Sequence, residues 1–163
     1  MKKSFLTIFL VASLSLSVFG QTDVDDYFNS DEWRVSLAVM QIGNMITLID
    51  GTIPMFNGAV QVSPGTYMVR GTGSGGERII VVETNNILGV VAVAFTDTGP
   101  DTQATFNHFR GAINSSHLRL ENAVTTTNSI QGTLVRSSGG RKYRFSMDHT
   151  PRSQQVVVTI VRQ

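Results

Sequence analysis

Alternation of apolar and polar residues with a period of two dominates the chain from Trp33 onward. Within residues 33–40, apolar side chains at every second position predict a strand that buries one of its faces. Turn residues such as Pro64-Gly65 separate this run from others like it. The further runs cover residues 45–49, 59–62, 66–70, 78–84, 88–96, 102–113, 117–121, 124–136, 142–148 and 155–161. Apolar residues do not recur every three or four positions over a stretch long enough for a helix. We therefore expect at most one short helix, within residues 25–33.

Many short strands with turn residues between them predict an all-β fold of about 8–10 strands. Two architectures suit this pattern: a small antiparallel barrel of lipocalin-like size, and a jelly roll or sandwich. Residues 88–95 (LGVVAVAF) are apolar on both faces, which predicts a central strand. No change of composition divides the rest of the chain, so we expect residues 32–163 to form a single β domain.

Trp33, near the start of the first predicted strand, and an arginine near the end of the domain resemble the arrangement in lipocalins. Asp31 stands where lipocalins carry a glycine, two residues before the tryptophan. The resemblance is one of architecture and implies neither a ligand nor a site residue.

The first twenty residues have the pattern of a signal peptide. Lys2 and Lys3 precede an apolar run at residues 5–12, and Gly20 supplies the small residue before the expected cut. Cleavage before Gln21 leaves an acidic lead-in, residues 21–31, that is expected to be flexible. The serines after the apolar run argue against an uncleaved anchor, and no other segment is long and apolar enough to form a transmembrane helix.

The chain has no cysteine, so a lipid anchor on a cysteine is excluded. Removing residues 1–20 leaves 143 residues, enough to bury a core without disulfides. Together with the MKK start, these features favour a bacterial protein that is periplasmic or secreted.

Charge is distributed unevenly. Loss of Lys2 and Lys3 lowers the formal net charge from +1 to −1, which argues against nucleic acid as a partner. Residues 21–101 carry ten acidic and three basic side chains, whereas residues 102–163 carry two acidic and eight basic ones. Either the two halves pair with each other in the fold, or the basic half meets an anionic partner.

Catalytic and metal-binding motifs are not found. His108, His117 and His149 do not have the spacing of zinc ligands, and no serine lies in a nucleophile elbow. The glycine-rich segment 71–76 precedes a predicted strand rather than a helix, unlike a phosphate-binding loop. We therefore expect a non-catalytic protein without cofactor or metal.

Two loops are the candidate binding surfaces. Basic side chains flank the turn at residues 137–140, and the glycine-rich loop is expected to form a rim at one end of the sheet. The candidate residues are Arg136, Arg141, Lys142, Arg144, Gly73 and Gly75.

The favoured function is that of an exported soluble module that binds a small ligand, a glycan or a protein partner, with anionic partners among the candidates. The alternative is an eight-stranded outer-membrane β-barrel with a structural or adhesive role. One Trp and three Tyr are few for the two aromatic girdles of such a barrel.

Overall fold

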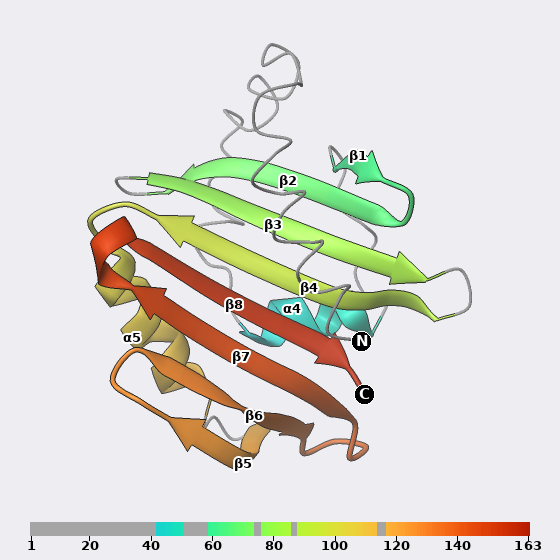
Figure 1. Cartoon of the computed structure of the whole chain (residues 1–163). Helices are drawn as coiled ribbons and strands as arrows, with labels where there is room; N and C mark the ends of the chain where they lie inside the picture. Colours follow the sequence, from blue (N-terminus) through green and yellow to red (C-terminus); the bar gives the residue numbers. More distant parts are fainter. Residues whose placement is uncertain (1–41, 51–58, 74–75, 86–87, 114–116) are drawn as a thin grey trace.

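The structure is a computed structural model that describes residues 42–50, 59–73, 76–85, 88–113 and 117–163 (Figure 1). The predicted signal peptide (1–20), the acidic lead-in (21–31) and the strand predicted at residues 33–40 lie outside the described residues. In the described part of the chain, no helix has the length and apolar character needed to cross a membrane.

One antiparallel sheet of eight strands forms the body of the molecule, in the order β1-β2-β3-β4-β8-β7-β6-β5. This confirms the predicted all-β fold. The described strands form an open sheet and not the closed barrel that was one of the two predicted architectures, and β1 and β5 are the edges of this sheet within the described residues. The strands are β1 (Val60–Ser63), β2 (Thr66–Gly73), β3 (Gly76–Asn85), β4 (Gly89–Thr98), β5 (Leu118–Thr125), β6 (Ser129–Arg136), β7 (Lys142–Thr150) and β8 (Gln155–Arg162).

The strand order has an approximate two-fold symmetry about the centre of the sheet. β1 to β4 form one meander and β5 to β8 form a second, and the last strands of the two meanders pair in the middle. The helix α5 (Thr102–Ala112) carries the chain from the centre of the sheet to its far edge, where the second meander begins. Phe95 faces Val158 at the middle of the central pair, and the predicted central strand is indeed β4.

The run predicted at residues 124–136 is interrupted by a tight turn. β5 ends at Thr125 and β6 begins at Ser129, so the two strands form a hairpin. The hydroxyl of Thr126 accepts hydrogen bonds from the backbone N–H groups of Asn128 (3.3 Å) and Ser129 (3.0 Å). A side-chain oxygen that closes its own turn in this way is a common role of threonine. The other strand predictions that fall on β1 to β4, β7 and β8 are confirmed to within a few residues.

Two predicted strands are helices, so these two predictions were wrong. Residues 45–49 belong to α4 (Ile42–Ile49), and residues 102–113 form α5 with the residue that follows it. The buried residues of α5 and its C-cap are Thr102, Phe106, Phe109 and Ile113, which are spaced by three or four. That spacing puts them on one face of a helix, whereas a strand would turn alternate residues inward.

Both helices cover the same face of the sheet, and they lie behind it in Figure 1. The main core fills the space between the helices and the sheet. Its large side chains include Phe95, Phe106, Phe109, Phe145 and Ile160. A short 3-10 turn, η2 (Pro151–Ser153), connects β7 to β8.

The helical state of α5 predicts opposite outcomes for two residues that would share a face in a strand. Phe106→Ala should lower the free energy of unfolding by about 3–5 kcal/mol, because it empties a buried site. His108→Ala, at an exposed position two residues away, should change it by less than about 0.5 kcal/mol. Urea unfolding of both variants measures these changes, and comparable losses at the two positions would argue for a strand.

Candidate functional site

A groove of about 440 Å³ lies between α4, the end of α5 and the beginning of β5. Buried or half-buried apolar side chains form its walls: Ile42 and Ile46 from α4, Ala112 from α5 and Leu118 from β5. Ile42 and Ile46 are one helical turn apart and are both buried, so together they form the apolar floor beneath the groove. The lining is completed by Gly43, Asn44, Thr47, His117 and Arg136.

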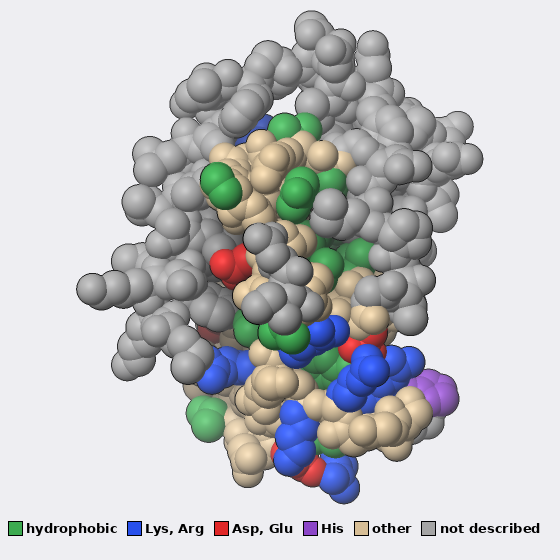
Figure 2. All heavy atoms as spheres, turned by 90° about the vertical axis from the view of Figure 1, so that its right-hand side faces the viewer, with side chains coloured by type: hydrophobic (Ala, Val, Ile, Leu, Met, Phe, Trp, Pro, Cys, Tyr) green, Lys and Arg blue, Asp and Glu red, His purple; other side chains and the backbone are tan. Residues whose placement is uncertain are grey.

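Basic side chains gather at the same end of the molecule as the groove. Figure 2 shows Lys and Arg side chains over the lower part of one side, with a histidine at the margin of this group. Arg136, at the end of β6, is the cation that lines the groove, and 39% of its side chain is exposed. His117 is exposed and precedes β5.

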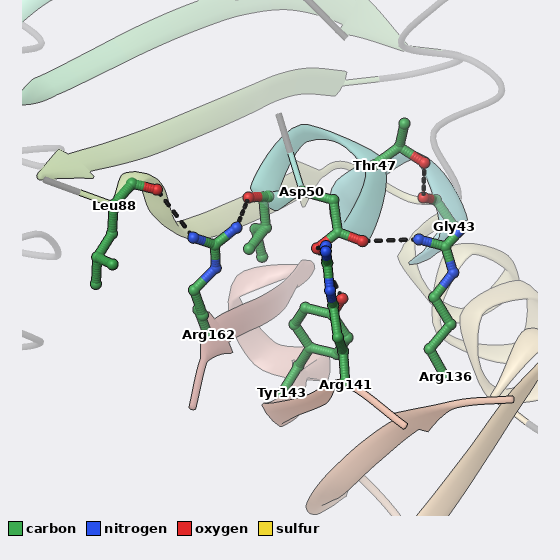
Figure 3. Close-up of polar contacts among 9 residues, drawn as sticks. Gly43, Thr47, Asp50, Leu88, Arg136, Arg141, Tyr143 and Arg162 are labelled. Atoms are coloured by element: carbon green, nitrogen blue, oxygen red, sulfur yellow. Dashed lines mark hydrogen bonds and ion pairs between the residues drawn. The ribbon is translucent and has the colours of Figure 1, made fainter. Parts of the chain in front are cut away.

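The carboxylate of Asp50 is buried beside the groove and holds three side chains together (Figure 3). Only 2% of the Asp50 side chain is exposed. Arg136 donates from Nη1 to Oδ2 at 2.7 Å, while Arg141 Nη1 (2.9 Å) and the Tyr143 hydroxyl (2.8 Å) both contact Oδ1. We call these four residues the Asp50 cluster. It joins the end of α4 to the hairpin of β6 and β7.

Asp50 needs these positively charged and hydrogen-bonding partners because of where it lies. Its backbone N–H donates to the Ile46 carbonyl at 2.9 Å, so the residue continues the last turn of α4. A negative charge is unfavourable at the C-terminal end of a helix, and it is costly where water is excluded. Burial by itself raises the pKa of Asp50, but the hydrogen bonds from Tyr143, Arg141 and Arg136 outweigh it, and the pKa lies below its ordinary value.

The partners of Asp50 respond in the complementary direction. Burial and the hydrogen bond to Asp50 raise the pKa of Tyr143, so the phenol keeps the proton that it donates. The hydrogen bond and the attraction to Asp50 raise the pKa of Arg141. The cluster therefore holds one carboxylate, one neutral phenol and two guanidinium groups.

Arg162 makes a second attachment to α4 in the same region (Figure 3). From β8 it donates hydrogen bonds to the carbonyl oxygen of Ile49, the last residue of α4, and to that of Leu88 at 2.9 Å. A guanidinium that binds the final carbonyl of a helix is favourable both as a cap and through the helix dipole. The walls of the groove are thus held by fixed contacts of the fold.

The structure brings together two of the residues that the sequence indicated, Arg136 and Arg141, through Asp50. Lys142 and Arg144 lie on the opposite face of the sheet, because they alternate with the inward-facing Tyr143 on β7. Lys142 Nζ is 3.9 Å from a carboxylate oxygen of Glu121, and Arg144 is exposed.

The glycine-rich loop lies far from the Asp50 cluster. Gly73 ends β2 and faces Gly76 across the hairpin, and Gly75 lies outside the described residues. Figure 1 shows the hairpin of β2 and β3 and the turn between β6 and β7 at opposite ends of the sheet. The two loops therefore do not form one site.

The uneven charge distribution is explained in part by the Asp50 cluster. Among the ion pairs of the described residues, those of Asp50 with Arg136 and Arg141 join the acidic half to the basic half. The pairs of Arg78 with Asp97 and of Lys142 with Glu121 stay within one half.

The three histidines are dispersed. His108 is exposed on α5, His117 lines the groove, and His149 is buried at the other end of the core, 3.4 Å from the Thr102 hydroxyl. In the described ranges, no group of three or more His, Cys, Asp or Glu residues is placed to hold a metal ion.

Asp50 was not among the candidate residues that the sequence indicated. The available signal was Tyr143, a phenol on the apolar face of a predicted strand, since a buried hydroxyl needs a hydrogen-bond partner.

No family model, no curated protein and no solved structure matches this chain. The groove and the Asp50 cluster are therefore the features on which a function can be argued.

Replacement of Asp50 tests the electrostatic role of the cluster. Asp50→Asn keeps the shape and removes the charge, and at pH 7 it should lower the free energy of unfolding by roughly 1.5–3 kcal/mol. The folded state holds the pKa of Asp50 below the value of about 3.9 in unfolded chains. The unmodified protein should therefore have its full excess in free energy of unfolding over Asp50→Asn at pH values above the unfolded pKa. This excess should disappear as the pH falls through the pKa of Asp50 in the folded state.

Urea unfolding of both proteins from roughly pH 7 to pH 2.5 measures this difference, and a difference that does not change with pH would contradict the account. Asp148→Asn is the matched control. Burial raises the pKa of Asp148, so removal of its charge at pH 7 should not destabilise the fold.

Proposed function

We propose that this chain is an exported, non-catalytic binding module whose ligand site is the groove between α4 and the beginning of β5. The observation that carries the proposal is a concave, apolar-walled site with a few polar groups at its margin. Its volume of about 440 Å³ lies in the range of roughly 300–1,000 Å³ that is usual for small-molecule sites.

The rigidity of the walls supports the proposal. Asp50 and Arg162 hold α4 against the sheet at its C-terminal end, and the apolar side of α4 packs into the core. A preformed site binds with little loss of conformational freedom, whereas a site that must first be ordered binds more weakly. The groove is therefore suited to recognition of a small ligand.

The chemistry of the groove favours binding over catalysis. The described residues that line it include no carboxylate, and the Thr47 hydroxyl donates to the Gly43 carbonyl at 2.7 Å. General acid–base or nucleophilic catalysis needs a base within hydrogen-bond reach of the reacting group. His117 is the base among the described lining residues, but none of them is a carboxylate, a serine or a cysteine that could act with it. Arg136 and His117 are therefore placed to recognise charge and to hydrogen-bond at the margin.

The signal-peptide pattern of residues 1–20 is the basis for export in this proposal. The open sheet, with one face covered by two helices, supports a binding module over the eight-stranded membrane barrel. A barrel in a membrane has its strands closed into a ring, because no water is present to pair with the edges.

A change at Gly43 tests the site without damage to the fold. Gly43 lines the groove, and a Cβ added there meets no atom within 4 Å. Gly43→Leu should fill part of the groove while it leaves the fold intact, since leucine favours a helix more than glycine does. In a fluorescence titration with 1-anilinonaphthalene-8-sulfonate, we expect one saturable site that is weakened at least about tenfold, or ~1.4 kcal/mol, by Gly43→Leu.

Gly111→Leu is the matched control. Gly111 is also an exposed helical glycine with open space at its Cβ, but it does not line the groove. This variant should bind the dye as the unmodified protein does. Equal dye binding by all three proteins would reject the groove as the site.

A further inference from the structure

We infer that the groove is built for an amphipathic monoanion. A single carboxylate or a comparable head group binds at Arg136, and a short aliphatic tail lies along Ala112 and Leu118, above the buried Ile42 and Ile46. This inference rests on the proposed function and specifies its ligand class.

The charge of the Asp50 cluster favours an anionic ligand. One buried carboxylate faces the guanidinium groups of Arg136 and Arg141, and the high pKa of Tyr143 keeps its phenol neutral. The cluster therefore carries one positive charge in excess. A positive charge beside an apolar wall is stabilised by an anion that approaches it, because solvent there is reduced.

Arg136 is the residue through which this excess charge reaches the groove. Arg136 lines the groove, whereas Arg141 does not, although both contact Asp50. Asp50 engages Nη1 of Arg136, and a guanidinium has five N–H donors in a planar fork. Arg136 thus has more donors than Asp50 uses, in the arrangement that suits a second carboxylate.

The charges around the groove favour a ligand with a single negative charge. A single negative charge neutralises the excess of the cluster, whereas a second one would meet no described cation in the groove other than Arg136. The Asp50 carboxylate, on the other side of the same guanidinium, would repel it. Inorganic phosphate and other multiply charged small anions are therefore poor ligands.

An aliphatic tail can cover the apolar surface that the groove still exposes. Ile42 and Ile46 are 0% and 2% exposed and form the floor of the groove at the edge of the main core, while the half-buried Ala112 and the exposed 8% of Leu118 offer apolar surface above them. Burial of that surface contributes roughly 25 cal/mol for each Å² removed from water. A ligand with a head group alone would leave this wall unused.

Isothermal titration calorimetry with four probes separates the contributions of head and tail. Sodium octanoate should bind with one site per chain, at least about tenfold more tightly than octan-1-ol or acetate. Octylammonium should not bind measurably, since it brings a like charge to Arg136. The affinity for octanoate should fall as salt is added, while that for octan-1-ol should not.

Two arginine variants form the matched pair. Arg136→Gln and Arg141→Gln each remove one positive charge and one contact to Asp50, but only the first changes the groove. We expect Arg136→Gln to weaken octanoate binding at least about tenfold and to leave octan-1-ol unchanged. Arg141→Gln also removes the excess charge but keeps the donors that line the groove, so it should weaken octanoate binding by only about two- to threefold, a loss that disappears as salt is added. Circular dichroism checks that both are folded. If Arg136→Gln is not, Arg136→Lys replaces it, and loss of the planar fork should still weaken octanoate binding several-fold.

The outcomes distinguish this inference from the proposed function. Equal affinity for octanoate and octan-1-ol, or equal effects of the two arginine variants, would overturn the inference that the ligand is a monoanion bound at Arg136. The groove would then remain the proposed binding site. Absence of binding by every probe, together with dye binding that is unaffected by Gly43→Leu, overturns both.

Discussion

The buried carboxylate of Asp50 is the interaction on which the arrangement of this molecule depends. An ionised group with 2% exposure is tolerated only where opposite charge and hydrogen bonds replace its water. Arg136, Arg141 and Tyr143 supply them from the second meander, while Asp50 itself ends the helix that precedes the first. The requirement to pair one charge thereby joins parts of the chain that are 86 to 93 residues apart.

The groove is a consequence of how one face of a wide sheet is covered. In the described part of the chain, two short helices lie on a sheet of eight strands, and they pack mainly against its central strands. The space between α4, the end of α5 and β5 is lined by Ile46, Ala112 and Leu118. Arg136 belongs both to this lining and to the Asp50 cluster, so the contact that holds α4 in place also sets the charge of the groove.

The strands were predictable because a period of two is a local signal, readable wherever one face is buried. The helices were not recognised for two reasons. α4 has only eight residues, and several of them are β-branched and typical of strands. α5 consists mostly of small and polar residues, so Phe106 and Phe109 alone did not reveal its helical spacing. The order of the strands rests on pairing between distant segments, which no single run of sequence reveals. For the same reason Arg136 was recognised as a candidate by its type, while its partner Asp50 was found only in the fold.

The central claim is that the groove beside the Asp50 cluster is the place where this protein binds a ligand. A backbone amide NMR titration of the ¹⁵N-labelled protein with sodium octanoate tests it directly. The account predicts that the largest shifts fall on Gly43, Asn44, His117, Leu118 and Arg136, and that His149 and its surroundings, at the other end of the core, do not respond. Shifts centred on the hairpin of β2 and β3, or spread over the whole sheet without a maximum at the groove, would contradict it.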